Sequence, residues 1–265
     1  MKALAPLLGR TLVVVAHPDD EVIGCGALLQ RMRQGAVVFC TDGAPLDDFF
    51  WKRYGSREAY ARVRQREARK ALGCIRGRVE PIFLADRNPV LVDQQLFRFL
   101  PAAFEALSEV IRERHPEALL ALTYEGGHPD HDSCCFLAAQ LSKEHYIPAW
   151  EFPLYHRSTD GVGVKQEFAI PGAEDVVLHA NADEQDVKRR MLEAYASQGD
   201  IGAHFGVELE RYRPLAEYDF SRPPLPGVLN YEAWQWPITG PQVCESFVHF
   251  LEAGSRKPDL ARQHT

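Results

Sequence analysis

Short apolar runs alternate with amphipathic stretches through the first half of the chain. Apolar runs typical of strands buried on both faces lie at residues 11–16, 36–41, 81–84 and 118–123. Segments with apolar residues at helical spacing predict helices at residues 19–33, 57–72, 96–114 and 131–144. Gly35 and Gly73 are placed to end the first two helices. The alternation predicts right-handed crossovers and an α/β fold with a mostly parallel sheet flanked by helices.

The pattern changes in the second half of the chain. Residues 151–175 are rich in glycine and polar residues, 183–196 resemble a helix, and 212–240 are loaded with proline and aromatic residues. We expect a core of residues 1–148 and a C-terminal extension of residues 149–265, rich in loops and strands, that forms a pocket wall or lid. We also expect the two parts to be integrated in a single domain and the extension to determine specificity.

The composition narrows the classes of function. The chain has 30 lysines and arginines against 37 aspartates and glutamates, which gives a net charge of −7 and disfavours a nucleic-acid partner. Six cysteines among 265 residues are too sparse for a disulfide scaffold, so we expect them to be reduced. Neither a signal peptide nor an integral membrane segment is recognisable, which favours a cytoplasmic location. The sequence leaves the oligomeric state open, and a homo-oligomer is compatible with it.

One cluster of polar residues follows the first apolar run. Residues 16–21 read AHPDDE, so an imidazole and two adjacent carboxylates occupy the turn between a strand and a helix. His17 and Asp20 are three residues apart and can point to the same side of the turn, while Asp19 can face a substrate. Parallel sheets bind ligands beyond the carboxyl ends of their strands, which is where this turn lies. The alternative is that Asp19 or Asp20 only caps the following helix.

A second cluster follows the fourth apolar run, where residues 126–132 read GGHPDHD. His128 and His131 are again three residues apart, with Asp130 between them. A single histidine is more often a surface or core residue than a ligand, but two such turns after strands of one sheet converge on one crevice. Two histidines and one carboxylate, with an open position for water, form the ligand count of a catalytic zinc site. The pattern therefore indicates metal-assisted hydrolysis.

These motifs resemble those of the PIG-L or LmbE-like N-deacetylases. The resemblance covers about residues 10–145 and includes AHPDDEVIGCGALL, the TDG that follows the second strand, a helix with Arg64 and Glu67, and the GHPDH turn. A weaker match covers residues 188–198. Members of this family are metal-dependent, Rossmann-like hydrolases that remove acyl groups from amino sugars. The resemblance implies that residues 1–148 are a metal-binding catalytic core that deacetylates an N-acetylglucosamine-type sugar, whether free, lipid-linked, nucleotide-linked or a glycoside.

The resemblance also implies a metal site and a general base. The implied ligands are His17, Asp20 and His131, with Zn²⁺ as the expected ion, although Fe²⁺ or another divalent ion fits the same ligands. Asp19 would be the general base. His128 would stabilise the oxyanion or protonate the leaving amine as a histidinium, with Asp130 orienting it.

Substrate contacts are implied as well. Arg64 and Asp86 match family positions that contact sugar hydroxyls. Some members have a tyrosine that polarises the carbonyl, but Gly126 stands at that position here, which leaves Tyr124 or a residue of the second half for this role. Trp234 and Trp236 could stack on a sugar ring, or could simply fix a loop to the surface.

Two other functions remain open on the same residues. The chain could be a metal-dependent amidase that cleaves a non-acetyl amide, such as a thiol conjugate. Outside the enzymes, it could be a catalytically silent sugar-binding module. In each case the expected partner is a small molecule or a glycoconjugate.

Overall fold

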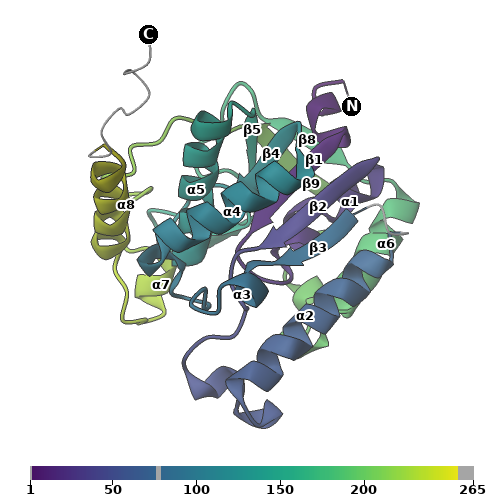
Figure 1. The fold of residues 1–265 in the computed structure, drawn as a ribbon. Helices are drawn as coiled ribbons and strands as arrows, with labels where there is room; N and C mark the ends of the chain where they lie inside the picture. The colour runs from purple at the N-terminus through teal and green to yellow at the C-terminus, as the bar shows by residue number, and fades with distance from the viewer. Residues whose placement is uncertain (1, 76–78, 256–265) are drawn as a thin grey trace.

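Five neighbouring strands of the sheet run parallel in the computed structural model, which describes residues 2–75 and 79–255 (Figure 1). The strands are β1 (Arg10–Val15), β2 (Gln34–Phe39), β3 (Val79–Phe83), β4 (Ala118–Leu122) and β5 (Ala149–Phe152). Their order is β3-β2-β1-β4-β5, so the direction of the connections reverses between β1 and β4. Ligands of such sheets bind at this reversal, beyond the carboxyl ends of the two strands.

Helices cover both faces of the sheet. The long helices of the core are α1 (Asp20–Arg31), α2 (Arg57–Gly73), α4 (Leu100–Arg114) and α5 (Pro129–His145). In Figure 1, α4 and α5 lie together on one face, with α8 (Gly240–Ser255) beside them. Short helices are η1 (Ala5–Leu8), η2 (Asp48–Phe50), η3 (Lys52–Tyr54), α3 (Leu84–Arg87) and η4 (Leu96–Arg98).

The predicted fold class is confirmed, and two local predictions are wrong. Helix α1 ends at Arg31, and Gly35 lies within β2 opposite Thr11 instead of ending the helix. A Cβ atom at Gly35 would lie 3.1 Å from the Thr11 carbonyl oxygen, so close strand pairing accounts for the glycine. The segment 96–114, expected to be one helix, is divided into η4 and α4, because Pro101 favours the first turn of a helix.

Segments after residue 150 extend the same sheet with antiparallel strands. Strand β9 (Leu209–Pro214) pairs with β5, and β8 (Val176–His179) pairs with β9. The remaining elements are β6 (Tyr155–Arg157), β7 (Gly163–Lys165), α6 (Ala182–Glu193), η5 (Ala196–Gln198), η6 (Ile201–Ala203) and α7 (Asn230–Ala233). None of the helices in the described ranges has the length and apolar character needed to cross a membrane.

A buried ion pair joins this later part of the chain to α1. Lys188 Nζ lies 2.7 Å from Glu210 Oε1, and both side chains are fully buried. Lys188 donates a hydrogen bond to the carbonyl of Ile23, while Glu210 accepts hydrogen bonds from the N–H groups of Ala27 and Leu28. A charge left unpaired at such depth is costly, so these contacts fix α6 and β9 against the helix that follows the first histidine turn.

Candidate functional site

Three buried histidines meet beyond the carboxyl ends of β1 and β4. His17 follows β1, whereas His128 and His131 stand at the start of α5, after β4. One ring nitrogen from each residue lies within 4.8 Å of the other two. Both ring nitrogens of His131 are buried, and Nδ1 has no hydrogen-bond partner in the described ranges. Because a buried polar group without a partner is costly, this set of donors suits a divalent metal ion.

Asp20 faces the histidines with one carboxylate oxygen. Its Oδ2 accepts hydrogen bonds from the N–H groups of Ala16 and His17, at 3.1 and 2.8 Å. Its Oδ1 lies 3.3 Å from His131 Nε2. The structure therefore brings together the three predicted ligands, His17, Asp20 and His131, while His128 is a further imidazole within reach. Which of these residues bind the ion stays a prediction.

Two more carboxylates contact the imidazole of His17. Asp93 Oδ1 and Asp130 Oδ2 each lie 3.1 Å from His17 Nε2. Burial alone would lower the pKa of His17, but Asp93, Asp130 and Asp20 together raise it well above its ordinary value. A strong negative potential thus surrounds the histidines, as a cation site requires.

Asp19 is held in a strained backbone conformation with φ of +131°, a region that non-glycine residues seldom adopt. Its N–H donates a 3.0 Å hydrogen bond to Glu21 Oε2, and Tyr195 donates its hydroxyl hydrogen to the other oxygen of Glu21. Arg64 donates to the carbonyl of Pro18 and, at 3.3 Å, to Asp19 Oδ2. These contacts fix both the backbone and the carboxylate of Asp19 at the edge of the cavity.

The environment of Asp19 also sets its protonation. Burial raises the pKa of Asp19 to about 6, although the Arg64 guanidinium opposes this shift. The carboxyl group therefore titrates near neutral pH, as a general base should.

His128 differs from its predicted state. Its Nδ1 accepts a 3.1 Å hydrogen bond from the backbone N–H of Asp130, so the proton of the neutral ring lies on Nε2. Burial, together with His17 and His131, lowers the pKa of His128 well below its ordinary value. The structure favours a neutral imidazole instead of the expected histidinium.

Asp130 orients His128 through its backbone and not, as expected, through its carboxylate. The two carboxylate oxygens accept hydrogen bonds from the N–H groups of Gln94 and Leu96, at 2.6 and 3.0 Å, and also contact His17. Its fully buried side chain thereby anchors the segment that carries Asp93.

A cavity of about 310 Å³ opens in front of these residues. Its walls include the predicted residues His17, Asp19, Asp20, Arg64 and His128, together with Trp234 and Trp236. Asp86, which lies in α3, is exposed, accepts a hydrogen bond from Gln65 and is not among the described residues of these walls, so its contact with a sugar stays a prediction. Asp93 lines the cavity instead, and the sequence offered no motif around it.

Tyr155 is a second residue that the sequence did not single out. The hydroxyl of Tyr124 donates to the carbonyl of Arg222, outside the cavity walls. The ring of Tyr155 lies 5.2 Å from that of His131 and lines the cavity. Glu125 accepts hydrogen bonds from the N–H groups of Leu154 and Tyr155. A Cβ atom at Gly127 would lie 2.0 Å from the Tyr155 carbonyl oxygen, so only glycine permits this approach.

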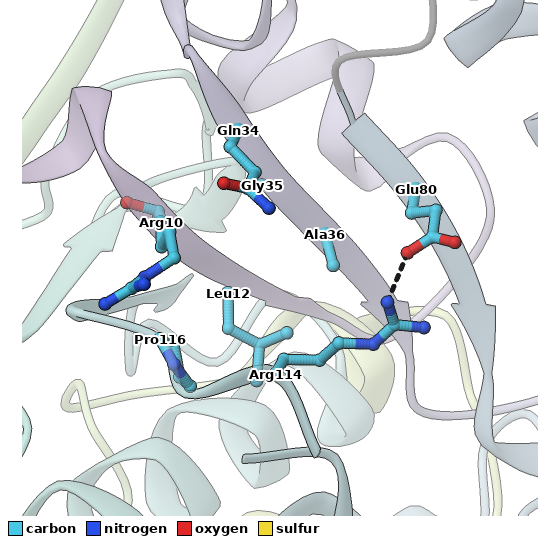
Figure 2. Close-up of a pocket in the computed structure, with 9 residues that line it drawn as sticks. Arg10, Leu12, Gln34, Gly35, Ala36, Glu80, Arg114 and Pro116 are labelled. Atoms are coloured by element: carbon cyan, nitrogen blue, oxygen red, sulfur yellow. Dashed lines mark hydrogen bonds and ion pairs between the residues drawn. The ribbon is translucent and has the colours of Figure 1, made fainter. Parts of the chain in front are cut away.

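A second cavity lies at the opposite edge of the sheet, at the amino ends of β1, β2 and β3 (Figure 2). Arg114 forms an ion pair with Glu80 at 2.5 Å, which Figure 2 marks with a dashed line. Among the described residues of its walls there is neither a histidine nor a cysteine, so these residues lack the chemistry of the first cavity.

Comparisons with known proteins agree with this geometry. The family model described as PIG-L, GlcNAc-PI de-N-acetylase, matches residues 12–142. The 2'-N-acetylparomamine deacetylase of Streptomyces fradiae is 33% identical over 214 residues, covering 72% of this chain and 74% of that protein. The 1D-myo-inositol 2-acetamido-2-deoxy-alpha-D-glucopyranoside deacetylase of Mycobacterium leprae is 27% identical over 255 residues, covering 73% of this chain and 81% of that protein.

Solved structures share the fold. A deacetylase triple mutant of the teicoplanin biosynthetic pathway has a TM-score of 0.60 at 18% identity and covers 79% of this chain and 99% of its own. The A40926 pseudoaglycone deacetylase has a TM-score of 0.56 at 18% identity, with the same coverage. The matched region contains both histidine turns, and the Streptomyces relative is similar over most of its length. The predicted resemblance is thus confirmed, and the chain belongs to the PIG-L family.

Proposed function

We propose that the protein is a zinc-dependent N-deacetylase that removes the acetyl group from an N-acetylglucosamine-type amino sugar. The reaction consumes water and releases acetate and the free amine. The observation that carries this proposal is the position of Asp19, a carboxylate with a near-neutral pKa held at the edge of a buried histidine and aspartate cluster. The family and its two named relatives, which are deacetylases of amino sugars, support it.

The metal would be held by His17, His131 and Asp20, with His128 next to them. When bound, a divalent ion polarises the acetyl carbonyl and lowers the pKa of the attacking water. Asp19 takes the proton from that water and returns it to the leaving nitrogen as the carbon–nitrogen bond breaks. Arg64 favours the ionised form of Asp19 before the first of these transfers, because its charge lowers the pKa of the carboxyl group.

His128 and Tyr155 are neutral hydrogen-bond donors that can bind the acetyl oxygen or the leaving nitrogen. His128 carries its proton on Nε2, as its accepted hydrogen bond dictates. Burial raises the pKa of the Tyr155 hydroxyl well above its ordinary value, so the phenol stays protonated and can donate. We assign to Tyr155 the carbonyl-polarising role that the sequence left open. Neutral donors aimed at developing charge contribute strongly to such reactions.

Acetate release tests the proposal. Zinc-loaded protein is incubated with free N-acetylglucosamine, simple glycosides of it and UDP-N-acetylglucosamine, and acetate and primary amine are quantified together. We expect equal amounts of both products from at least one sugar. A matched panel of N-propionyl sugars and thiol-conjugate amides separates deacetylation from a wider amidase activity. Metal-replete protein that binds these sugars and releases no acetate would contradict the proposal and identify a binding module.

A further inference from the structure

A series of aromatic rings leads from the histidine cluster to the outside of the cavity. The ring of Tyr155 lies 5.2 Å from His131 and 6.1 Å from Trp234. Trp234 in turn lies 5.1 Å from Trp236, whose ring is 5.1 Å from His128. Tyr155 and Trp236 are mostly buried, whereas Trp234 is 49% exposed. A tryptophan that lines a cavity and stays half in water is available to an apolar ligand.

Two other aromatic residues enter the same cavity from different segments. Phe205 follows η6, and its ring lies 6.3 Å from Tyr155. Phe50 ends η2 and contacts Phe49, which is 71% exposed, at a ring distance of 5.5 Å. Leu46, in the same segment as Phe50, is 61% exposed. Exposed apolar side chains gathered at the mouth of a cavity indicate a binding surface.

The charges around the cavity disfavour a phosphate-bearing substrate. Among the described residues of its walls, Arg64 is the permanent cation, and its buried guanidinium is already engaged with Pro18 and Asp19. Asp19, Asp20 and Asp93 contribute negative charge to the same walls. Arg53 and Lys165 lie close by but donate to the carbonyls of Ser197 and His204 and are outside the walls. Away from the ion at the histidine cluster, an anionic aglycone would therefore meet mainly aromatic rings and the polar side chains of His204 and Gln198.

We propose that Trp234, Phe205 and Phe50 form an aglycone subsite that takes an uncharged, apolar or aromatic group linked to the amino sugar. This inference rests on the proposed deacetylation, since the acetamide must lie at the histidine cluster for its aglycone to reach Trp234. Stacking on Trp234 and burial against the two phenylalanines stabilise the bound glycoside without using a charge.

The test compares three substrates of the zinc-loaded protein: free N-acetylglucosamine, its phenyl glycosides in both anomeric forms, and UDP-N-acetylglucosamine. We expect a kcat/KM about tenfold higher for one phenyl glycoside than for the free sugar, mainly through KM. Trp234→Ala removes this preference, because it lowers kcat/KM for the phenyl glycoside by about tenfold and lowers kcat/KM for the free sugar less. The matched control is Tyr146→Ala, which removes an aromatic ring that is 93% exposed and outside the cavity walls.

Three outcomes would overturn the subsite: equal kcat/KM for phenyl glycoside and free sugar, a preference for the UDP-linked sugar, or a Trp234→Ala variant impaired equally on all substrates. Binding of the phenyl glycoside to the Asp19→Asn variant, followed by calorimetry, separates the subsite from the chemistry. If no sugar is deacetylated but the phenyl glycoside binds about tenfold tighter than the free sugar, and only while Trp234 is present, the proposed function fails and the subsite stands.

Discussion

The tripeptide His-Pro-Asp occurs twice in this chain and adopts two different structures. At residues 17–19 the helix begins only after the aspartate, so Asp19 is the N-cap residue, with φ of +131° and no capping hydrogen bond from its side chain. At residues 128–130 the histidine is the N-cap, its ring accepts the Asp130 N–H, and Asp130 is fully buried in the first turn of α5. A shift of two residues in the helix start thus places one aspartate at the edge of the cavity and buries the other in the first turn of the helix.

The largest expected difference between the two turns is catalytic. Asp19→Asn keeps the size of the side chain but cannot accept a proton from water. We expect kcat to fall by about 10² to 10⁴ while the metal content stays unchanged, because the loss of a general base has that magnitude. Acetate release and elemental analysis of the same protein sample measure both quantities. A variant that retains wild-type turnover would remove Asp19 from the mechanism.

The complementary change, Asp130→Asn, is expected to act on stability. Both oxygens of Asp130 accept backbone hydrogen bonds, and an amide can replace only one of them. The buried N–H left without an acceptor costs about 1–3 kcal/mol in the free energy of unfolding. Urea unfolding of the metal-free protein measures this loss.

Asp132→Asn is the matched control for that change. One oxygen of Asp132 accepts both of its backbone hydrogen bonds, and burial raises its pKa to about 8, so an amide reproduces the neutral side chain. We expect a markedly smaller loss than for Asp130→Asn. Equal losses in the two variants would mean that Asp130 does not anchor the 94–96 segment in the way described.

A smaller effect should follow from loosening what holds Asp19 in its strained conformation. Tyr195→Phe removes the hydroxyl that holds Glu21 in place, and Glu21 is the acceptor for the Asp19 N–H. We expect kcat to fall roughly tenfold with KM unchanged, since small displacements of a reacting group are costly. Tyr212→Phe removes a hydroxyl that bonds Glu210 and the carbonyl of Gly24, on the same helix but away from Asp19. It should lower stability and leave kcat within about twofold, whereas a similar loss of kcat in both variants would point to general loosening of α1.

The smallest expected effect is on the pH profile. Asp19 must be ionised to accept a proton, and its pKa is about 6, so kcat/KM should decline as the pH falls through 6. Arg64 lowers the pKa of Asp19, so Arg64→Gln should move this acid limb to higher pH. Steady-state rates between pH 5 and 8 would reveal the shift. An acid limb that does not move would mean that another group limits the rate.

The sequence predicts the parallel core well, because strands buried on both faces need continuous apolar runs such as residues 11–16. The sequence also predicts that both histidine turns lie at one edge of the sheet, because the carboxyl ends of parallel strands meet at the same edge. It fails where long-range packing decides the local structure. Gly35 ends no helix, because β2 pairs so closely with β1 at this position that a Cβ atom would lie 3.1 Å from the Thr11 carbonyl oxygen.

The residues that the sequence missed come from segments without a motif. Asp93 reaches His17 only because Asp130, in another segment, accepts the N–H groups of Gln94 and Leu96. Tyr155 reaches the cavity because Gly127 makes room for it and Glu125 holds its backbone. Both placements depend on contacts between residues more than twenty positions apart in the sequence. The periodic pattern of apolar residues, from which helices and strands are predicted, does not reveal such contacts.

The central claim is that the buried histidine and aspartate cluster holds one divalent ion on which deacetylation depends. The most direct measurement is the metal content of the purified protein, taken together with acetate release before chelation, after chelation and after Zn²⁺ is restored. We predict about one equivalent of a divalent ion, loss of activity with its removal, recovery on its return, and loss of the ion in His131→Ala. Metal-free protein that still released acetate at the original rate would contradict the account.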